Sequence, residues 1–326
     1  MTEASGREWL PGVVSRRSLL KASALVAVAG VSVPRLGKNQ QTFFGLDVPF
    51  DDPATVDDIS SLVGATPSVV SLFLKLDSDV PVARLQQMSA AKQTPFVTLE
   101  PWLLASKQGQ VNQPGFSLGS IIRGDHDAAF RRLASGIGAI PGPIFIRFAH
   151  EMNAWWYPWC EAVNGNRPGQ YIRAWRHVRQ VFARSTNRGF RWVWSPNVLL
   201  DVTRTLPTLK ELYPGDRAVD YVGMTGYSHG GSSPATTFGP TLVQLRALSS
   251  RPVVLSEIGA NGPAAPTWVR GLAGYLAANR QIQGFVYFDT SPGTTGATGN
   301  YSIRQSPAMV AAFRSMVRAI GANRTR

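Results

Sequence analysis

The chain has 326 residues, of which 44 % are hydrophobic and 16 % are charged, which excludes a protein that is disordered throughout and fits one large domain or two small ones. Its net charge is +13, but the arginines are dispersed without a Lys/Arg run, so we expect no nucleic-acid partner. The single cysteine, Cys160, excludes an intrachain disulfide framework and is expected to be a packed free thiol.

The N-terminus carries an export pattern. Residues 15–21, SRRSLLK, precede an apolar run from Ala22 to Val33, which predicts a twin-arginine signal and a secreted protein. The run is too short to span a bilayer stably, so the segment is either cleaved or kept as a weak anchor. The alternative is a disordered basic terminus with a chance arginine pair. We therefore set residues 1–38 apart and expect residues 39–326 to form one catalytic domain.

Short apolar segments recur along the rest of the chain, and several are continuous runs of the kind found in strands buried on both faces. The eight expected strands are Thr42–Val48, Val69–Leu74, Pro95–Leu99, Ile144–Ala149, Phe190–Ser195, Tyr221–Gly226, Val253–Ser256 and Gly284–Phe288. Segments with helical periodicity lie between and after them: Thr55–Val63, Val80–Ala91, Asp125–Ile140, Pro168–Arg184, Thr208–Leu212, Thr237–Leu248, Pro266–Ala278 and Pro307–Ile320. This alternation predicts a single (β/α)₈ barrel. The alternative is a doubly wound sheet, but residues 47–50, DVPF, could not cradle a pyrophosphate after the first strand.

Functional residues of such barrels lie where the strands end, and acidic and aromatic side chains gather at those positions. They are Asp47, Glu100, Trp102, His150, Glu151, Trp194, Tyr227, Glu257, Phe288 and Asp289. On the fourth predicted strand, alternation places Arg147 on the same face as Glu151 and below it. A buried cation needs a carboxylate partner, for which Asp47, Glu100 or Asp289 could serve without taking part in chemistry.

Glu151 and Glu257 end the fourth and seventh strands, which face each other across a barrel mouth. Two carboxylates across a groove can hydrolyse a glycosidic bond, one as the proton donor and the other as the nucleophile. We expect the indoles near Glu151 to raise its pKa, which suits the acid, and Tyr227 and His150 to keep Glu257 ionised.

Four motifs together resemble glycoside hydrolase family 26: HEMNAWWYPW (150–159), WVWSPN (192–197), YVGMTGY (221–227) and VVLSEIG (253–259). That family consists of retaining barrel enzymes, mainly β-mannanases, with some members acting on β-1,3-xylan or mixed-linkage β-glucan. The resemblance extends over about residues 42–320. It implies a polysaccharide substrate and no cofactor or metal.

Residue by residue, the resemblance implies that Glu151 is the acid/base and Glu257 the nucleophile, held by His150 and Tyr227. Trp156 is similar to the tryptophan that floors the subsite at the cleaved bond. We expect Trp102, Trp159 and Trp194 to add sugar-binding surfaces.

Two positions differ from mannanases of the family. Thr225 stands where an aspartate is common, and Phe288, followed by Asp289, stands where a tryptophan is common. Both positions help to recognise the sugar, so the catalytic pair is better supported than mannan as the substrate.

Two other classes of function stay open. A non-catalytic glycan-binding barrel would keep the indoles but has no need of both glutamates. A barrel enzyme for phosphorylated substrates would suit the basic charge and the glycine-rich residues 292–300, but carboxylates at the mouth would repel phosphate. The histidines lack metal-ligand spacing, so we predict no metal site, and we expect a monomer without a stable membrane span.

Overall fold

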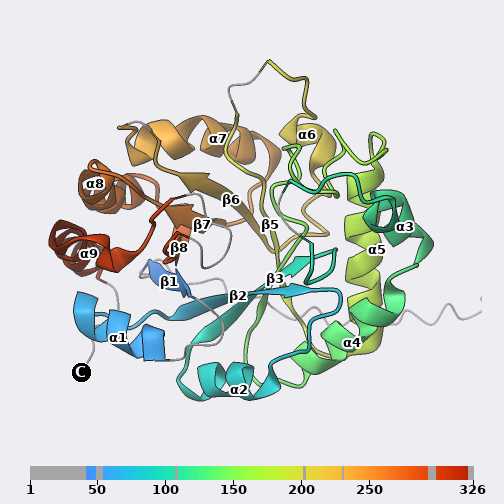
Figure 1. Ribbon diagram of the computed structural model, residues 1–326, viewed down its shortest axis with the longest axis horizontal. Coiled ribbons are helices and arrows are strands. Elements are labelled where there is room, and N and C mark those ends of the chain that lie inside the picture. Colours follow the sequence, from blue (N-terminus) through green and yellow to red (C-terminus); the bar gives the residue numbers. More distant parts are fainter. Residues whose placement is uncertain are drawn as a thin grey trace, which may run out of the picture. The chain divides into compact units, whose positions relative to one another are not determined.

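The computed structural model describes residues 42–48, 54–106, 109–200, 203–229, 231–292 and 299–321, so the predicted export segment lies outside the described residues. Eight parallel strands close into a barrel in the order β1 to β8, with β8 paired to β1 (Figure 1). The predicted (β/α)₈ barrel is thereby confirmed. Among the described residues, no helix has the length and hydropathy needed to cross a membrane.

The strands begin within three residues of their predicted positions. They are β1 (Phe43–Asp47), β2 (Val69–Lys75), β3 (Thr94–Glu100), β4 (Phe145–Phe148), β5 (Arg191–Trp194), β6 (Tyr221–Tyr227), β7 (Val253–Gly259) and β8 (Ile282–Phe288). Their apolar runs were recognisable because a parallel strand is covered on one face by helices and on the other by the barrel interior.

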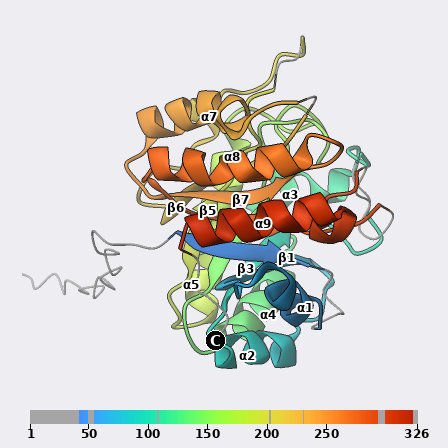
Figure 2. The ribbon, with the colours of Figure 1, turned by 90° about the vertical axis from the view of Figure 1, so that its left-hand side faces the viewer.

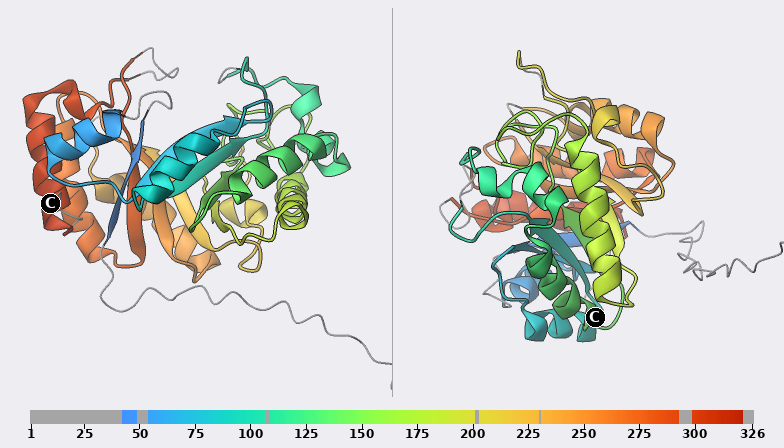
Figure 3. Two further views of the ribbon diagram at one scale, coloured as in Figure 1. Left: turned by 90° about the horizontal axis from the view of Figure 1, so that it is seen from below. Right: turned by 90° about the vertical axis from the view of Figure 1, so that its right-hand side faces the viewer.

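The helices form the outer layer. They are α1 (Ala54–Val63), α2 (Val82–Ala90), α3 (Leu118–Arg123), α4 (Asp127–Gly138), α5 (Gln170–Ser185), α6 (Leu209–Leu212), α7 (Pro234–Leu248), α8 (Ala265–Ala278) and α9 (Pro307–Ala319). In Figure 2, α8 and α9 lie side by side on the outside of the barrel, and Figure 3 shows the green helices α3, α4 and α5 packed together on another side. The short helices η1 (Pro114–Phe116) and α3 were not predicted, because each is shorter than two helical turns and has little periodicity of its own.

The barrel interior is built in layers. Near the beginnings of the strands, one buried apolar layer fills the cross-section, and its members are Val69, Phe96, Phe145, Val193, Tyr221, Val254 and Val286. Because side chains alternate along a strand, the next inward residues form a second layer, which is mostly polar. It includes Ser71, Thr98, Arg147, Ser195 and Thr225, all buried. The polar layer separates the apolar layer from the mouth.

A register shift sets the position of Glu257. The pairing of β6 with β7 shifts between Met224 and Thr225, so that Thr225 pairs with Glu257 and Ser256 is skipped. The extra residue of β7 lies in the interior, where Ser256 Oγ is 2.6 Å from Ser195 Oγ. A bulge of this kind re-aims the side chain that follows it.

Candidate active site

Glu257 is held by a cation and a phenol. Its Oε2 lies 2.6 Å from Nη2 of Arg147, and its Oε1 accepts a hydrogen bond from the hydroxyl of Tyr227. Burial and the neighbouring Glu257 raise the pKa of Tyr227 well above its usual value, so the phenol keeps the proton that it donates. A Cβ at Gly259 would lie 2.7 Å from the Tyr227 ring, so the glycine leaves the room that this ring occupies. Both oxygens of Glu257 are thus bonded to a donor, and the two donors fix the orientation of the carboxylate.

Arg147 is itself fully buried and positioned from three strands. Its Nε donates to Thr98 Oγ1 at 2.8 Å, and its Nη1 donates to Thr225 Oγ1 at 3.4 Å. The guanidinium also lies over the rings of Phe73 and Phe96, at 5.3 Å and 5.7 Å from their centroids. The hydrogen bonds and the rings fix the cation under the mouth.

Glu151 has different neighbours. Its Oε2 accepts from the indole Nε1 of Trp156 at 2.7 Å, and its Oε1 accepts from Nδ2 of Asn197 at 3.1 Å. Asn197 is in turn fixed by Asn153, because Asn197 N donates to Asn153 Oδ1 and Asn153 Nδ2 donates to Asn197 O. Asn153 and Asn197 thus join the loop after β4 to the residues that follow β5, next to the carboxylate of Glu151.

The backbone at Glu151 is left-handed. Glu151 has a φ of 55° and Ala149 a φ of 45°, values that side chains with a Cβ seldom adopt. Their amides still reach both neighbouring strands, since Ala149 N donates to Leu99 O and Glu151 N donates to Ser195 O. The expected alternation from Arg147 to Glu151 is therefore wrong in detail: β4 ends at Phe148, and two left-handed residues turn the glutamate into place.

Burial, then the nearby charge of Glu257, raises the pKa of Glu151 to about 7. The indole acts in the opposite direction to the one expected, because the hydrogen bond from Trp156 stabilises the ionised carboxylate and lowers this pKa. A carboxyl that keeps a proton near neutral pH can act as a general acid. The two glutamates thus have different surroundings: Glu151 accepts hydrogen bonds from an indole and an amide, and Glu257 is bonded to a guanidinium and a phenol.

His150 does not hold Glu257. Its ring packs against Phe73, Tyr157 and Trp159, with centroids 5.0–5.9 Å apart, and its Nδ1 has no hydrogen-bond partner among the described residues. Burial and the charge of Arg147 lower its pKa well below the usual value, so the ring is neutral. The donors on Glu257 are Arg147 and Tyr227, and the expected role of His150 is corrected accordingly.

None of the three carboxylates considered as partners of Arg147 forms an ion pair with it in the described structure. Glu100 Oε2 accepts from the indole of Trp102 at 2.9 Å, and Asp289 Oδ1 accepts from the amide of Ile303 at 2.6 Å. Asp47 is buried with no hydrogen-bond partner on Oδ2, and its pKa is raised to about 7, chiefly by burial. The ion-pair partner of Arg147 is Glu257, which lies across the barrel and could not be paired with it by position along the chain.

Three of the proposed sugar-binding tryptophans are core residues. Trp159 and Trp194 are 0 % exposed and Trp102 is 2 % exposed, so none offers a ring face to a ligand in this structure. Trp194 lies on the outer face of β5, where it contacts the ring of Tyr213, because its neighbour Val193 occupies the inner face. Trp156 and Phe288 are half-buried and remain candidates for contact with a sugar.

Several residues around the glutamates were not assigned a role from the sequence. Thr98 and Thr225 position Arg147, and Asn153 and Asn197 position Glu151. Both asparagines lie within the motifs at 150–159 and 192–197. They follow different strands, so the sequence did not show that they contact each other and that Asn197 contacts Glu151.

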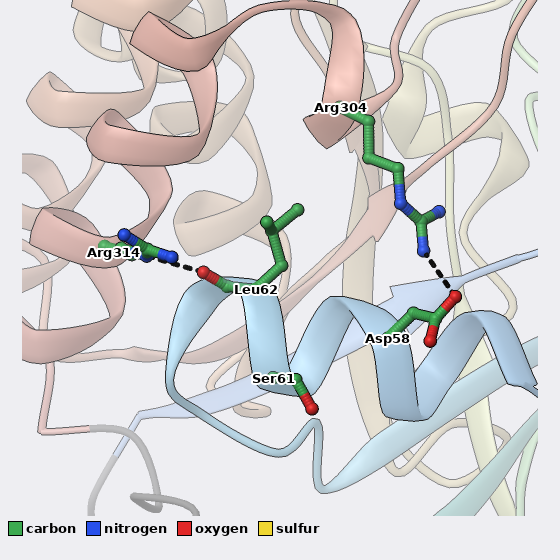
Figure 4. Close-up of a pocket in the computed structure, with 5 residues that line it drawn as sticks. All are labelled: Asp58, Ser61, Leu62, Arg304 and Arg314. Atoms are coloured by element: carbon green, nitrogen blue, oxygen red, sulfur yellow. Dashed lines mark hydrogen bonds and ion pairs between the residues drawn. The ribbon is translucent and has the colours of Figure 1, made fainter.

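A surface depression lies away from these glutamates. It is lined by Asp58, Ser61, Leu62, Arg304 and Arg314, from α1, α9 and the short helix Ile303–Gln305 (Figure 4). Arg304 pairs with Asp58 at 3.2 Å, and Arg314 Nε donates to Leu62 O at 2.5 Å. Both cations are thus occupied in joining α1 to the end of the chain, and the depression is not part of the candidate active site.

Residues 132–277 match the family model of glycosyl hydrolase family 26, which confirms the resemblance drawn from the motifs. Endoglucanase H of Acetivibrio thermocellus is 26 % identical over 244 residues, which are 71 % of this chain but 25 % of that protein. The chain therefore spans about a quarter of the length of this curated relative.

Solved structures share the fold. A family 26 β-mannanase from Bacteroides ovatus has a TM-score of 0.68 at 16 % identity, covering 88 % of this chain and 91 % of its own. The family 26 domain of an endo-β-mannanase/endo-β-glucanase from Prevotella bryantii has a TM-score of 0.65 at 12 % identity, covering 86 % of this chain and 89 % of its own.

Proposed function

We propose that this chain, whose residues 132–277 match the model of glycosyl hydrolase family 26, is a secreted retaining glycoside hydrolase that cleaves β-linked polysaccharide. The observation that supports it most directly is the contrast between Glu151 and Glu257. Both are buried at the ends of opposite strands, yet one has a pKa raised to about 7 and the other is bonded to a guanidinium. The first substrate that we expect is β-1,4-mannan, cleaved within the chain as by an endo-β-1,4-mannanase.

The reaction is a double displacement. In the first step, a carboxylate oxygen of Glu257 attacks the anomeric carbon while Glu151 transfers its proton to the departing glycosidic oxygen. A covalent glycosyl ester on Glu257 and a free alcohol result. In the second step, Glu151, now ionised, accepts a proton from water as the water oxygen attacks the same carbon, and Glu257 leaves as a carboxylate. Two inversions return the sugar in its original configuration.

The surrounding residues support these roles. The cation of Arg147 and the phenol of Tyr227 stabilise the carboxylate that must leave in the second step. The hydrogen bonds from Trp156 and Asn197 stabilise Glu151 after it has given up its proton. Each glutamate is thus bonded by two donors.

The substrate can be identified by reducing-end release from β-mannan, glucomannan, β-1,3-xylan, mixed-linkage β-glucan and β-1,3-glucan. We expect release from mannan or glucomannan by the wild type and none by Glu257→Ala. Glu211→Gln, on the exposed start of α6, is the matched control and should keep full activity. Release from β-1,3-xylan or mixed-linkage β-glucan alone would favour the alternative activities, to which Thr225 and Phe288 could contribute.

The roles of the two glutamates can be separated by leaving group and by azide. Glu151→Ala should retain activity on a dinitrophenyl glycoside, whose leaving group needs no proton, and lose about 10²–10⁴-fold on polysaccharide. Azide should then rescue Glu151→Ala with a β-glycosyl azide and Glu257→Ala with an α-glycosyl azide. If folded wild-type protein binds one of the polymers and releases no sugar from any glycoside, the chain is a glycan-binding barrel and the hydrolase proposal is wrong.

A further inference from the structure

The end of the barrel opposite the glutamates is strongly basic. Each strand begins at this end, and the helix that precedes a strand ends there, so this end is built from last helical turns and from the connections to the next strand. Among the described residues, these connections carry five cations, Lys92, Arg188, Arg217, Arg251 and Arg280, and the last turns add Arg184, Arg246 and Arg318. The only carboxylates in the described connections are Asp216 and Asp220.

Both of these carboxylates are engaged within the fold. Asp216 Oδ1 accepts from Ser249 Oγ at 2.5 Å and from the hydroxyl of Tyr213, and Asp220 Oδ2 accepts from Trp192 N at 2.8 Å. They join neighbouring connections and offer no ion pair to the exposed cations. With eight cations against two carboxylates in these connections and last turns, this end keeps an excess of positive charge.

Part of this positive charge has a structural explanation. Cations are favourable at helix C-termini, and three of the arginines donate to backbone oxygens there. Arg188 Nη2 reaches Ile140 O and Gly142 O at 2.8 Å, Arg246 reaches Arg251 O at 2.5 Å, and Arg251 reaches Asp216 O at 2.6 Å.

Five exposed cations are not explained in this way, and we call them the basal cations. Their side chains form no hydrogen bond or ion pair with another described residue, and they are Lys92, Arg184, Arg217, Arg280 and Arg318. They come from five different helix ends around the barrel, so the positive charge spreads over a face rather than a point.

The chain also joins the barrel at this end. Strand β1 begins at Phe43, and the sequence that precedes it contains the apolar run from Ala22 to Val33. A short apolar segment or a basic surface alone binds a lipid bilayer weakly, and the two together are a typical combination for stable membrane binding. The carboxylates Glu151 and Glu257 lie at the other end of the barrel.

We propose that the basal cations bind the surface of an anionic lipid bilayer, with the mouth of the barrel turned away from the lipid. Each basic residue near such a surface contributes about a fivefold gain in partitioning, and the effect falls off within a Debye length. No aromatic insertion is required, so the binding is electrostatic and is lost as salt rises. The mouth would then face polymers outside the membrane.

The test uses the full chain and two triple variants of equal charge. The first is Arg184→Glu, Arg217→Glu and Arg280→Glu. The second, the matched control, is Arg167→Glu, Arg173→Glu and Arg270→Glu, which are exposed cations near the starts of α5 and α8, toward the mouth. Co-sedimentation is measured with vesicles of phosphatidylcholine, with and without phosphatidylglycerol. The N-terminal residues are the same in all three proteins, so the ratio of binding to the two vesicles isolates the contribution of each face.

We expect the basal variant to lose on the order of a hundredfold in its preference for phosphatidylglycerol, and the control to lose less than about tenfold. Circular dichroism and hydrolysis of soluble substrate should be unchanged in both. Equal losses would show that net charge alone decides the binding and would overturn the proposal. Preferential binding of the wild type to soluble polyphosphate, at equal phosphate concentration, would overturn the assignment to a lipid surface. Neither result bears on the proposed hydrolysis.

Discussion

Nη2 of Arg147 lies 2.6 Å from Oε2 of Glu257, and the side chain of Arg147 has no solvent-exposed surface. The pair joins β4 to β7 through the interior, so the barrel's main buried cation is bonded to the proposed nucleophile. A buried charge of this kind requires its partner, because removal of either one leaves the other unpaired in a region of low dielectric.

Replacement of Arg147 should therefore cost both stability and activity. We expect Arg147→Met to lower the free energy of unfolding by about 3–5 kcal/mol and to remove most hydrolysis, with a smaller loss in Arg147→Lys. The matched control is Arg304→Met, which breaks the exposed pair with Asp58 and should cost less than about 1 kcal/mol. Urea unfolding measures the difference, and equal losses in the two variants would contradict the buried pair's importance.

The pH dependence of hydrolysis should reflect Glu151. Since the acid must be protonated, kcat/KM should fall as the pH rises through the pKa of about 7. Trp156→Phe removes a hydrogen bond that lowers this pKa, so the alkaline limb should move to higher pH. Asn197→Ala, which removes the other donor, should move it in the same direction, because its hydrogen bond also lowers the pKa. A limb that moves to lower pH in Trp156→Phe would contradict the assignment.

Tyr227 and His150 should respond differently to replacement by phenylalanine. Tyr227→Phe removes a hydrogen bond from Glu257 and should lower kcat by about 10-fold to 100-fold, as expected for the loss of a charge-assisted hydrogen bond. His150→Phe keeps a ring among Phe73, Tyr157 and Trp159 and should cost less than about 1.5 kcal/mol of stability. A fall in kcat for His150→Phe as large as that for Tyr227→Phe would restore the orienting role that the motif implied.

Asp47 should make the fold less stable as the pH rises from 4 to about 7. Burial raises its pKa from 3.8 to about 7, so between these values the folded protein holds a proton that the unfolded chain has released. Stability therefore falls as pH rises through this window, by on the order of 2–4 kcal/mol in total. Asp47→Asn removes this loss, and its advantage over the wild type should grow between pH 4 and about 7 and then level off.

Asp216→Asn is the control of opposite sign. Although burial opposes the change, hydrogen bonds from Ser249 and Tyr213 lower the pKa of Asp216. Its stabilising contribution is present above the usual carboxyl pKa and is lost as pH falls, so the variant should gain no advantage at alkaline pH. Chemical unfolding at a series of pH values measures both variants, and parallel curves for wild type and Asp47→Asn would show that Asp47 is ionised in the folded state.

The strands and most helices could be predicted because their signals are local. A run such as Phe145–Phe148 is apolar on both faces, and helix starts such as Pro307 have their own sequence preference. The carboxylates at the strand ends followed from the fold. The pairing of Arg147 with Glu257 could not be predicted, because it depends on which side chains meet across the barrel. Nor could the burial of the tryptophans at 102, 159 and 194, because it depends on whether each ring points into the core or toward the mouth.

The left-handed turn at Ala149 and Glu151 could not be predicted either. Neither residue is a glycine, and their amides donate hydrogen bonds to Leu99 O on β3 and to Ser195 O just after β5, which are distant in sequence. The neighbours of His150 were misjudged for the same reason, since the motif places it beside Glu151 in sequence while the turn directs it into the aromatic core.

The apolar layer near the beginnings of the strands has a consequence for the route of sugar and water. Because Phe96, Phe145 and Tyr221 and their neighbours fill the cross-section, the barrel is closed at that end. In the proposed double displacement, water attacks the anomeric carbon from the face that the leaving sugar chain has vacated. The apolar layer offers neither of them a route through the bottom of the barrel, so both would have to pass on the side of the mouth.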